Sequence, residues 1–151
     1  MRPHGWRLSI GPICLVLAIG FSSIPLPAFA IIKVACCGDS ITYGVGVPDR
    51  STQSYPAVLQ GLLGNEYQIL RPAAGGLTLL KKGDYSFWRD NAYRGTIAAE
   101  PNIIIVLLGT NDSKPVNWQY GAEFESDYHA LIDSFSAIPT RPKIMLALPP
   151  P

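Results

Sequence analysis

Three short polar segments of the sequence hold the residue types that acyl-transfer chemistry needs. Ser40 offers a hydroxyl nucleophile, the Gly75–Gly76 pair offers flexible backbone with free N–H groups, and Asn111 offers a side-chain amide. A serine esterase uses such a hydroxyl to attack an ester carbonyl, and such donors to hold the negative charge that develops on the carbonyl oxygen. Each residue alone has a common structural explanation, because serine caps helices, glycine supplies turns and asparagine bonds its own backbone. It is their combination that indicates a site.

Each polar segment follows a run of residues typical of a β-strand. Residues 31–37 form a short β-rich run, residues 67–70 a weaker one, and residues 103–108 an unbroken apolar run that suits a strand buried on both faces. The carboxyl ends of parallel strands meet at one edge of a sheet, and ligands bind beyond that edge. We therefore expect the three polar segments to converge there.

Helical patterns alternate with these strands. We expect helices over residues 54–64, 89–100 and 123–137, and a fourth strand over residues 144–148. The last of these helices is the clearest, because its apolar residues recur on one face. This alternation predicts an α/β fold, a three-layer α/β/α sandwich built around a parallel sheet.

Composition and charge exclude several function classes. The 151 residues allow one domain, and their formal net charge of +1 argues against a polybasic nucleic-acid binder. A nucleotide-binding doubly wound domain is disfavoured, because residues 38–46 do not contain G-x-G-x-x-G and no P-loop sequence is present. The adjacent Cys36 and Cys37 are expected to be two buried small residues in a strand, with a redox or metal role as the alternative. No metal or organic cofactor is expected.

The N-terminus has the order of a secretory signal peptide. Residues 1–7 carry two arginines and no acid, residues 8–24 are mostly apolar, and residues 28–30 read Ala-Phe-Ala. We expect residues 1–30 to be removed by cleavage after Ala30, leaving a secreted or periplasmic protein with no stable membrane insertion. A membrane anchor is the alternative, although the apolar run is short and interrupted.

The first and third polar segments together resemble one family. Residues 38–42 read Gly-Asp-Ser-Ile-Thr and residues 109–112 read Gly-Thr-Asn-Asp, a pair that resembles the SGNH (GDSL-type) hydrolases. The resemblance covers residues 31–149. It is greatest to secreted GDSL esterases of the carbohydrate acetylesterase-like kind, in which stretches like residues 78–84 and 109–115 recur. The fold that it implies is flavodoxin-like.

The resemblance assigns roles to four residues. Ser40 would be the nucleophile, and its own backbone N–H, the N–H of Gly76 and the side-chain amide of Asn111 would form the oxyanion hole. Asp39 would support the turn rather than transfer a proton. The implied reaction is hydrolysis of carboxylic esters, especially acetyl esters of carbohydrates, without a metal or cofactor. A small-molecule or carbohydrate ester is thus the expected partner.

The sequence departs from the family in two places. Residues 71–73 read Arg-Pro-Ala where the family usually has Asn, another residue and Gly. The family also carries a C-terminal Asp-x-x-His that supplies the base, and residues up to Pro151 do not contain one, so a C-terminal strand and helix are expected to be missing from residues 31–151. His129 is expected on the solvated flank of its helix. The alternative function is a non-catalytic, truncated SGNH-fold remnant or carbohydrate-binding protein.

Five aromatic residues follow the second and third polar segments. They are Tyr85, Phe87, Trp88, Trp118 and Tyr120. They either stack on sugar rings near the site or cover the edge of the sheet, and the sequence leaves both interpretations open.

Overall fold

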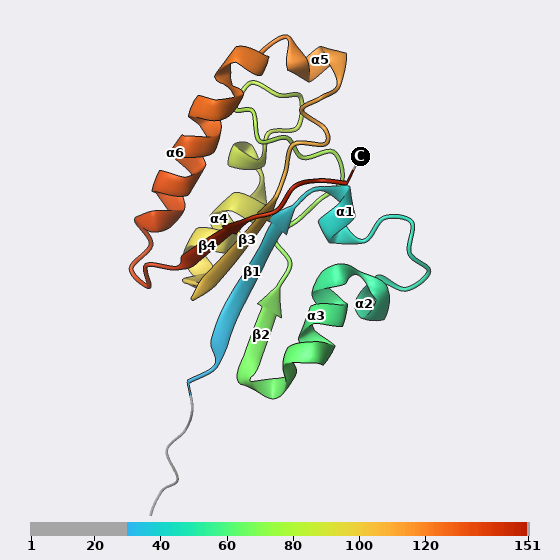
Figure 1. Ribbon diagram of the computed structural model, residues 1–151, viewed down its shortest axis with the longest axis vertical. Coiled ribbons are helices and arrows are strands. Elements are labelled where there is room, and N and C mark those ends of the chain that lie inside the picture. Colours follow the sequence, from blue (N-terminus) through green and yellow to red (C-terminus); the bar gives the residue numbers. More distant parts are fainter. Residues whose placement is uncertain (1–29, 151) are drawn as a thin grey trace, which may run out of the picture.

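Strands and helices alternate through residues 30–150, the part of the chain that the computed structural model describes (Figure 1). In chain order the elements, with η for a short 3₁₀ helix, are β1 (Ile32–Gly38), α1 (Ser40–Tyr43), α2 (Arg50–Gln53), α3 (Tyr55–Leu63), η1 (Gly64–Glu66), β2 (Tyr67–Leu70), η2 (Phe87–Arg89), α4 (Asn91–Ala99), β3 (Ile103–Leu107), α5 (Pro115–Trp118), η3 (Gly121–Glu123), α6 (Phe124–Ser136) and β4 (Lys143–Leu146). The predicted signal peptide, apart from Ala30, lies outside the described residues and stays a prediction. No helix within the described range is long and apolar enough to cross a bilayer.

The four strands form one parallel sheet in the order β2-β1-β3-β4. This is the flavodoxin-like order, in which the chain leaves β1 toward one edge of the sheet and later returns to pair β3 on the other side of β1. The arrowheads of β1 and β2 in Figure 1 point to the same end of the molecule, and β3 and β4 run parallel to them. The predicted α/β fold with a parallel sheet is confirmed, and the point between β1 and β3 is where such sheets bind ligands.

One face of the sheet carries the main core. Successive strand residues face opposite sides, so Ala35 and Cys37 of β1 lie on the same face as Ile104 and Val106 of β3. Helices α4 and α6 cover this face, with Leu131 and Phe135 of α6 buried against it; the other buried members are Leu77, Leu79, Phe87, Ala92, Leu108 and Ile138. The i, i+4 spacing of Leu131 and Phe135 explains why α6 forms here, because it puts both side chains on the helix face toward the sheet.

The adjacent cysteines lie on the two faces of β1 and are both fully buried and free. Burial raises the pKa of the Cys37 thiol to about 12, and it raises the pKa of Cys36 as well. A thiol that keeps its proton is a poor nucleophile and a poor metal ligand. The prediction of two buried small residues is confirmed.

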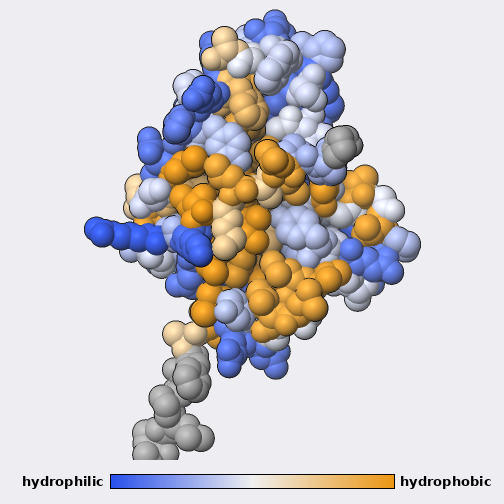
Figure 2. Space-filling view, viewed as in Figure 1, coloured by the Kyte–Doolittle hydropathy of each residue, from blue (hydrophilic) through white to orange (hydrophobic). Residues whose placement is uncertain are grey.

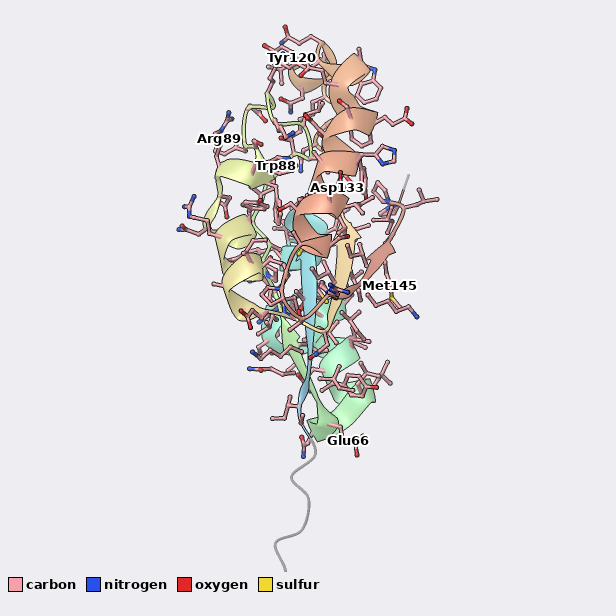
Figure 3. The ribbon with its side chains drawn as sticks, turned by 90° about the vertical axis from the view of Figure 1, so that its left-hand side faces the viewer. Glu66, Trp88, Arg89, Tyr120, Asp133 and Met145 are labelled. Carbon is pink, nitrogen blue, oxygen red and sulfur yellow. The ribbon has the colours of Figure 1, made fainter. Side chains whose placement is uncertain are left out.

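The opposite face of the sheet is only partly covered. Helix α3 packs on β2 at one side, whereas Ile103 and Ile105 of β3 keep partial exposure and Met145 of β4 is 41% exposed. Figure 2 shows the apolar surface that results, and Figure 3 shows Met145 on the side of the sheet away from α4. Leu62 of α3 is 78% exposed. Within the described residues, this face of the sheet therefore stays partly exposed.

Candidate active site

Asp39 and Ser40 follow β1 directly, and Ser40 is the first residue of α1. Asp39 is the N-cap of that helix, because its Oδ1 accepts a hydrogen bond from the Ile41 backbone N–H at 2.9 Å. The Asp39 side chain is fully buried, and burial raises its pKa while the Ile41 N–H acts in the opposite direction. The chain therefore turns sharply at the end of β1 and presents Ser40 at the carboxyl edge of the sheet.

Asn111, which follows β3, joins the first polar segment to the second. Its Nδ2 donates to Asp39 Oδ2 at 3.3 Å and to the Leu77 carbonyl oxygen at 3.1 Å. The residue is buried. One amide nitrogen thus lies between the turn after β1 and the residue directly after Gly76, at the switch point between β1 and β3.

Gly76 has φ of +85°, a left-handed conformation that glycine adopts at little cost. The Arg71-Pro72-Ala73 stretch, where the sequence departs from the family, still runs beside the end of β1. The Gly38 N–H donates to the Pro72 carbonyl at 3.3 Å, and Ala73 forms an isolated parallel bridge with Gly38. The departure therefore changes side chains without separating this segment from β1.

Asp112 is a second buried carboxylate of the site. Its two oxygens accept hydrogen bonds from the backbone N–H groups of Leu79 at 3.0 Å and Leu80 at 2.7 Å. Burial raises the pKa of Asp112, and these two N–H groups counteract that effect. Through these two hydrogen bonds, Asp112 holds the segment after Gly76 against the end of β3. Asp112 is the last residue of the Gly-Thr-Asn-Asp motif, and its role was missed from the sequence, where the available signal was a charged residue directly after a buried strand.

Asn117 is a further residue that sequence reasoning missed. It lies in α5, it is fully buried, and its Nδ2 donates to the Asn111 carbonyl at 2.8 Å and to Asp84 Oδ1 at 3.0 Å. Its Oδ1 accepts from the Asp84 backbone N–H at 2.9 Å. The hydrogen bond from Asn117 lowers the pKa of Asp84. No spacing signal in the sequence distinguishes Asn117 from the other asparagines.

We expect Asp112→Asn to destabilise the fold by about 1–3 kcal/mol, because the amide group must face one of the two N–H groups and leave it without an acceptor. Denaturant unfolding followed by circular dichroism measures this change. Asp133→Asn is the matched control: Asp133 is exposed on α6 (labelled in Figure 3), and its change is expected to stay within about 0.5 kcal/mol. Equal stability of the two variants would contradict the role given to Asp112.

The five aromatic residues separate into two groups. Phe87 is fully buried, and its ring packs against Tyr93 and Phe135 in the core. The interpretation that Phe87 stacks on a sugar is therefore wrong. Trp88 donates from Nε1 to the Leu79 carbonyl and packs on Tyr93. Tyr120 lies at the top of Figure 3, with the Lys82 ammonium over its ring.

Trp118 and Tyr85 keep large exposed surfaces. Trp118 packs on Phe124, with ring centroids 5.9 Å apart, and its indole lies against Gly121. Tyr85 borders the turn at Gly76, because a β-carbon built on Gly76 would lie 3.9 Å from its Cδ2 atom.

His129 lies on the exposed side of α6, as predicted. Its side chain is 72% exposed, and the nearest carboxylate is Glu125 on the same helix, 3.9 Å away. Asp127 is engaged elsewhere, because it accepts from the Lys81 backbone N–H and pairs with the Lys81 ammonium at 3.3 Å. Within residues 30–150 no cluster of three or more His, Cys, Asp or Glu side chains has the arrangement of a metal site.

The fold is that of a flavodoxin-like α/β protein, and the polar cluster is a candidate site at the β1/β3 switch point. The sequence model of the GDSL-like lipase/acylhydrolase family matches residues 36–151, and the chain belongs to that family.

Three relatives illustrate the similarity. An acetylxylan esterase of Xylanibacter ruminicola is 39% identical over 146 residues, covering 85% of this chain and 30% of that protein. A carbohydrate acetylesterase family member from Sinorhizobium meliloti is 25% identical with a TM-score of 0.59, covering 80% of this chain and 64% of its own. A family two carbohydrate esterase from Clostridium thermocellum, solved in complex with cellohexaose, is 22% identical with a TM-score of 0.62, covering 84% and 46%. The chain therefore spans less than two thirds of the length of each of these relatives.

Proposed function

We propose that residues 31–150 form the nucleophile and oxyanion-hole part of a secreted serine esterase that hydrolyses acetyl esters of carbohydrates. Ser40 is the nucleophile, and the backbone N–H groups of Ser40 and Gly76 and the side chain of Asn111 stabilise the oxyanion. Asp39 supports the turn that carries Ser40. Family membership and the similarity to an acetylxylan esterase support ester hydrolysis and this substrate class.

The observation that carries the proposal is the position of the Asn111 amide. Its Nδ2 lies within 3.3 Å of Asp39, the neighbour of Ser40, and within 3.1 Å of the carbonyl of Leu77, the neighbour of Gly76. One of its two N–H groups is held by Leu77. The other makes the longer contact to Asp39, and this is the donor that a developing oxyanion would attract, since catalytic hydrogen bonds often tighten only in the complex. Asp39 would keep its bond from Ile41.

The reaction proceeds in two halves. The Ser40 oxygen forms a bond to the acetyl carbonyl carbon while its proton passes to a general base, and the carbonyl oxygen takes the negative charge. Collapse of this intermediate breaks the bond to the sugar oxygen, which receives that proton and leaves. Water then attacks the acetyl-serine in the same way and releases acetate. The base is the histidine of the Asp-x-x-His segment that the family resemblance implies.

In a chain that carries an added Asp-x-x-His segment, we expect Asn111→Ala to lower kcat for an acetyl ester by about 10²–10³-fold with a KM within a few-fold of the parent, because the lost donor acts on the transition state. Steady-state hydrolysis of an acetyl ester checks this. Asn65→Ala is the control, because Asn65 is exposed in η1, which precedes β2 and lies at the opposite end of the sheet from the three polar segments (Figure 1). A kcat that is unchanged in Asn111→Ala would remove Asn111 from the oxyanion hole.

The second candidate function is carbohydrate binding without catalysis. It is favoured by the exposure of His129, the single histidine within the described residues, which leaves Ser40 without a base from that part of the chain. The two functions differ in one readout. A binding protein retains sugar affinity and shows no Ser40-dependent hydrolysis, even when a base is supplied.

A further inference from the structure

Tyr85 is a large aromatic side chain left in water beside the candidate site. It is 68% exposed, and a β-carbon built on Gly76 would lie 3.9 Å from its Cδ2 and 4.0 Å from its Cγ. The ring therefore borders the turn whose N–H group is proposed to face the oxyanion. A substrate whose acetyl carbonyl occupies that hole brings the alcohol half of the ester close to this ring.

The backbone of Tyr85 is held from several sides. Its carbonyl accepts from the Thr78 N–H at 2.9 Å, and the Phe87 N–H donates to the Thr78 carbonyl at 2.9 Å, so Ser86 forms a parallel bridge with Thr78. Its own N–H donates to Asp84 Oδ1 at 2.8 Å. Buried Phe87 anchors the segment two residues further along the chain.

Asn117 links the loop that carries Tyr85 to Asn111. It bonds both Asp84 and the carbonyl of Asn111, so the loop that carries Tyr85 is tied to the residue that carries the proposed oxyanion donor. The ring is thus presented by a fixed backbone at a defined place relative to the site. A rigid aromatic group loses little conformational freedom when a ligand stacks on it.

Folding does not account for the position of the Tyr85 ring. Within the described residues its ring takes part in none of the aromatic pairs or cation–π contacts, whereas Phe87, Trp88 and Trp118 all pack on other rings. Phe87, two residues further along the same segment, is fully buried in the core, whereas the Tyr85 ring is not. Exposed aromatic surface next to a site is instead suited to a ligand with an apolar face.

We propose that Tyr85 is the stacking platform of a sugar subsite, on which the C–H face of the acetylated pyranose ring lies while its ester enters the site. This subsite rests on the proposed function, because it is defined by the position of Gly76 in the oxyanion hole. It selects substrates by the alcohol half of the ester: an ester whose alcohol has no ring gains nothing from Tyr85.

The experiment measures binding separately from chemistry. Xylotetraose is titrated into the 151-residue chain labelled with ¹⁵N, and the Kd is taken from the shifts of the amide signals. We expect shifts at Gly76, Thr78 and Tyr85, a Kd about tenfold weaker in Tyr85→Ala, and a Kd close to wild type in Tyr85→Trp, which keeps a stacking face. Trp118→Ala is the matched control, since it removes another half-exposed ring from α5 and is expected to leave the Kd unchanged.

Three results would overturn the subsite: no binding of xylotetraose, an unchanged Kd in Tyr85→Ala, or a loss of affinity that follows Trp118→Ala instead. The proposed function is tested by a different measurement, the hydrolysis of 4-nitrophenyl acetate by the chain that carries an added Asp-x-x-His segment and by its Ser40→Ala variant. Hydrolysis that survives Ser40→Ala would defeat the esterase assignment while the Kd still reports on Tyr85. Ser40-dependent hydrolysis with an unchanged Kd in Tyr85→Ala would defeat the subsite alone.

Discussion

Joining an Asp-x-x-His segment from an active relative to the C-terminal side of residues 31–150 is expected to raise the turnover of an activated acetate by roughly a thousandfold or more. The reason is that a serine hydroxyl with an ordinary pKa is a weak nucleophile until a positioned base takes its proton. The chain without the segment is expected to retain only the modest acceleration that an oxyanion hole and binding provide. Turnover of 4-nitrophenyl acetate by the two proteins at equal concentration measures the difference.

His129→Ala and Ser40→Ala supply the controls for this experiment. His129→Ala is expected to leave the rate of both proteins unchanged, because the imidazole is 72% exposed and its nearest acid lies on the same helix. Ser40→Ala is expected to remove the whole gain from the added segment. A robust activity of the unextended chain that disappears in His129→Ala would show that His129 is the base, and the account of a base outside the described residues would be wrong.

Gly38→Ala is expected to destabilise the protein by about 3 kcal/mol or more and to abolish a defined site. A β-carbon at Gly38 would lie 2.0 Å from Thr42 Oγ1, 2.7 Å from Thr42 Cβ and 2.8 Å from the Leu107 carbonyl oxygen. The first contact involves a short, buried side chain, and the last involves the backbone of β3, so neither can move away freely. Overpacking of this kind costs about 1–3 kcal/mol, and more where backbone must shift. Thermal and denaturant unfolding measure it.

Gly95→Ala is the matched control, because Gly95 lies within α4 and a β-carbon there meets nothing within 4 Å. Alanine is the better helix former, so this variant is expected to be more stable by about 0.5–1 kcal/mol. If Gly38→Ala unfolded at the wild-type denaturant concentration, the close approach of β1, α1 and β3 described above would be incorrect.

The parts of the fold that follow from local pattern could be predicted from sequence. The apolar run of residues 103–108 and the i, i+4 face of α6 have strong periodic signals, and both elements form where expected. Boundaries were less accurate. The helix expected from residue 89 begins at Asn91, because Asp90 caps it by accepting from the Ala92 N–H and residues 87–89 form a separate turn of 3₁₀ helix.

The supports of the candidate site could not be predicted, because they depend on contacts between distant residues. The position of Asp112 after a buried strand marks it only weakly and nothing in the sequence marks Asn117, because the partners of both lie more than thirty residues away. The aromatic residues show the same limit. Phe87 and Tyr85 are two positions apart with similar side chains, yet only the structure distinguishes the buried ring from the exposed one.

The role of Ser40 as nucleophile is tested most directly by the site at which a fluorophosphonate ester reacts in the chain that carries the added Asp-x-x-His segment. Such an ester forms a stable bond with an activated serine oxygen, and peptide mass spectrometry locates it. We expect a single adduct on Ser40, lost in Ser40→Ala together with hydrolysis. An adduct on another hydroxyl such as Ser113, or hydrolysis that continues in Ser40→Ala, would contradict the assignment of Ser40 as the nucleophile.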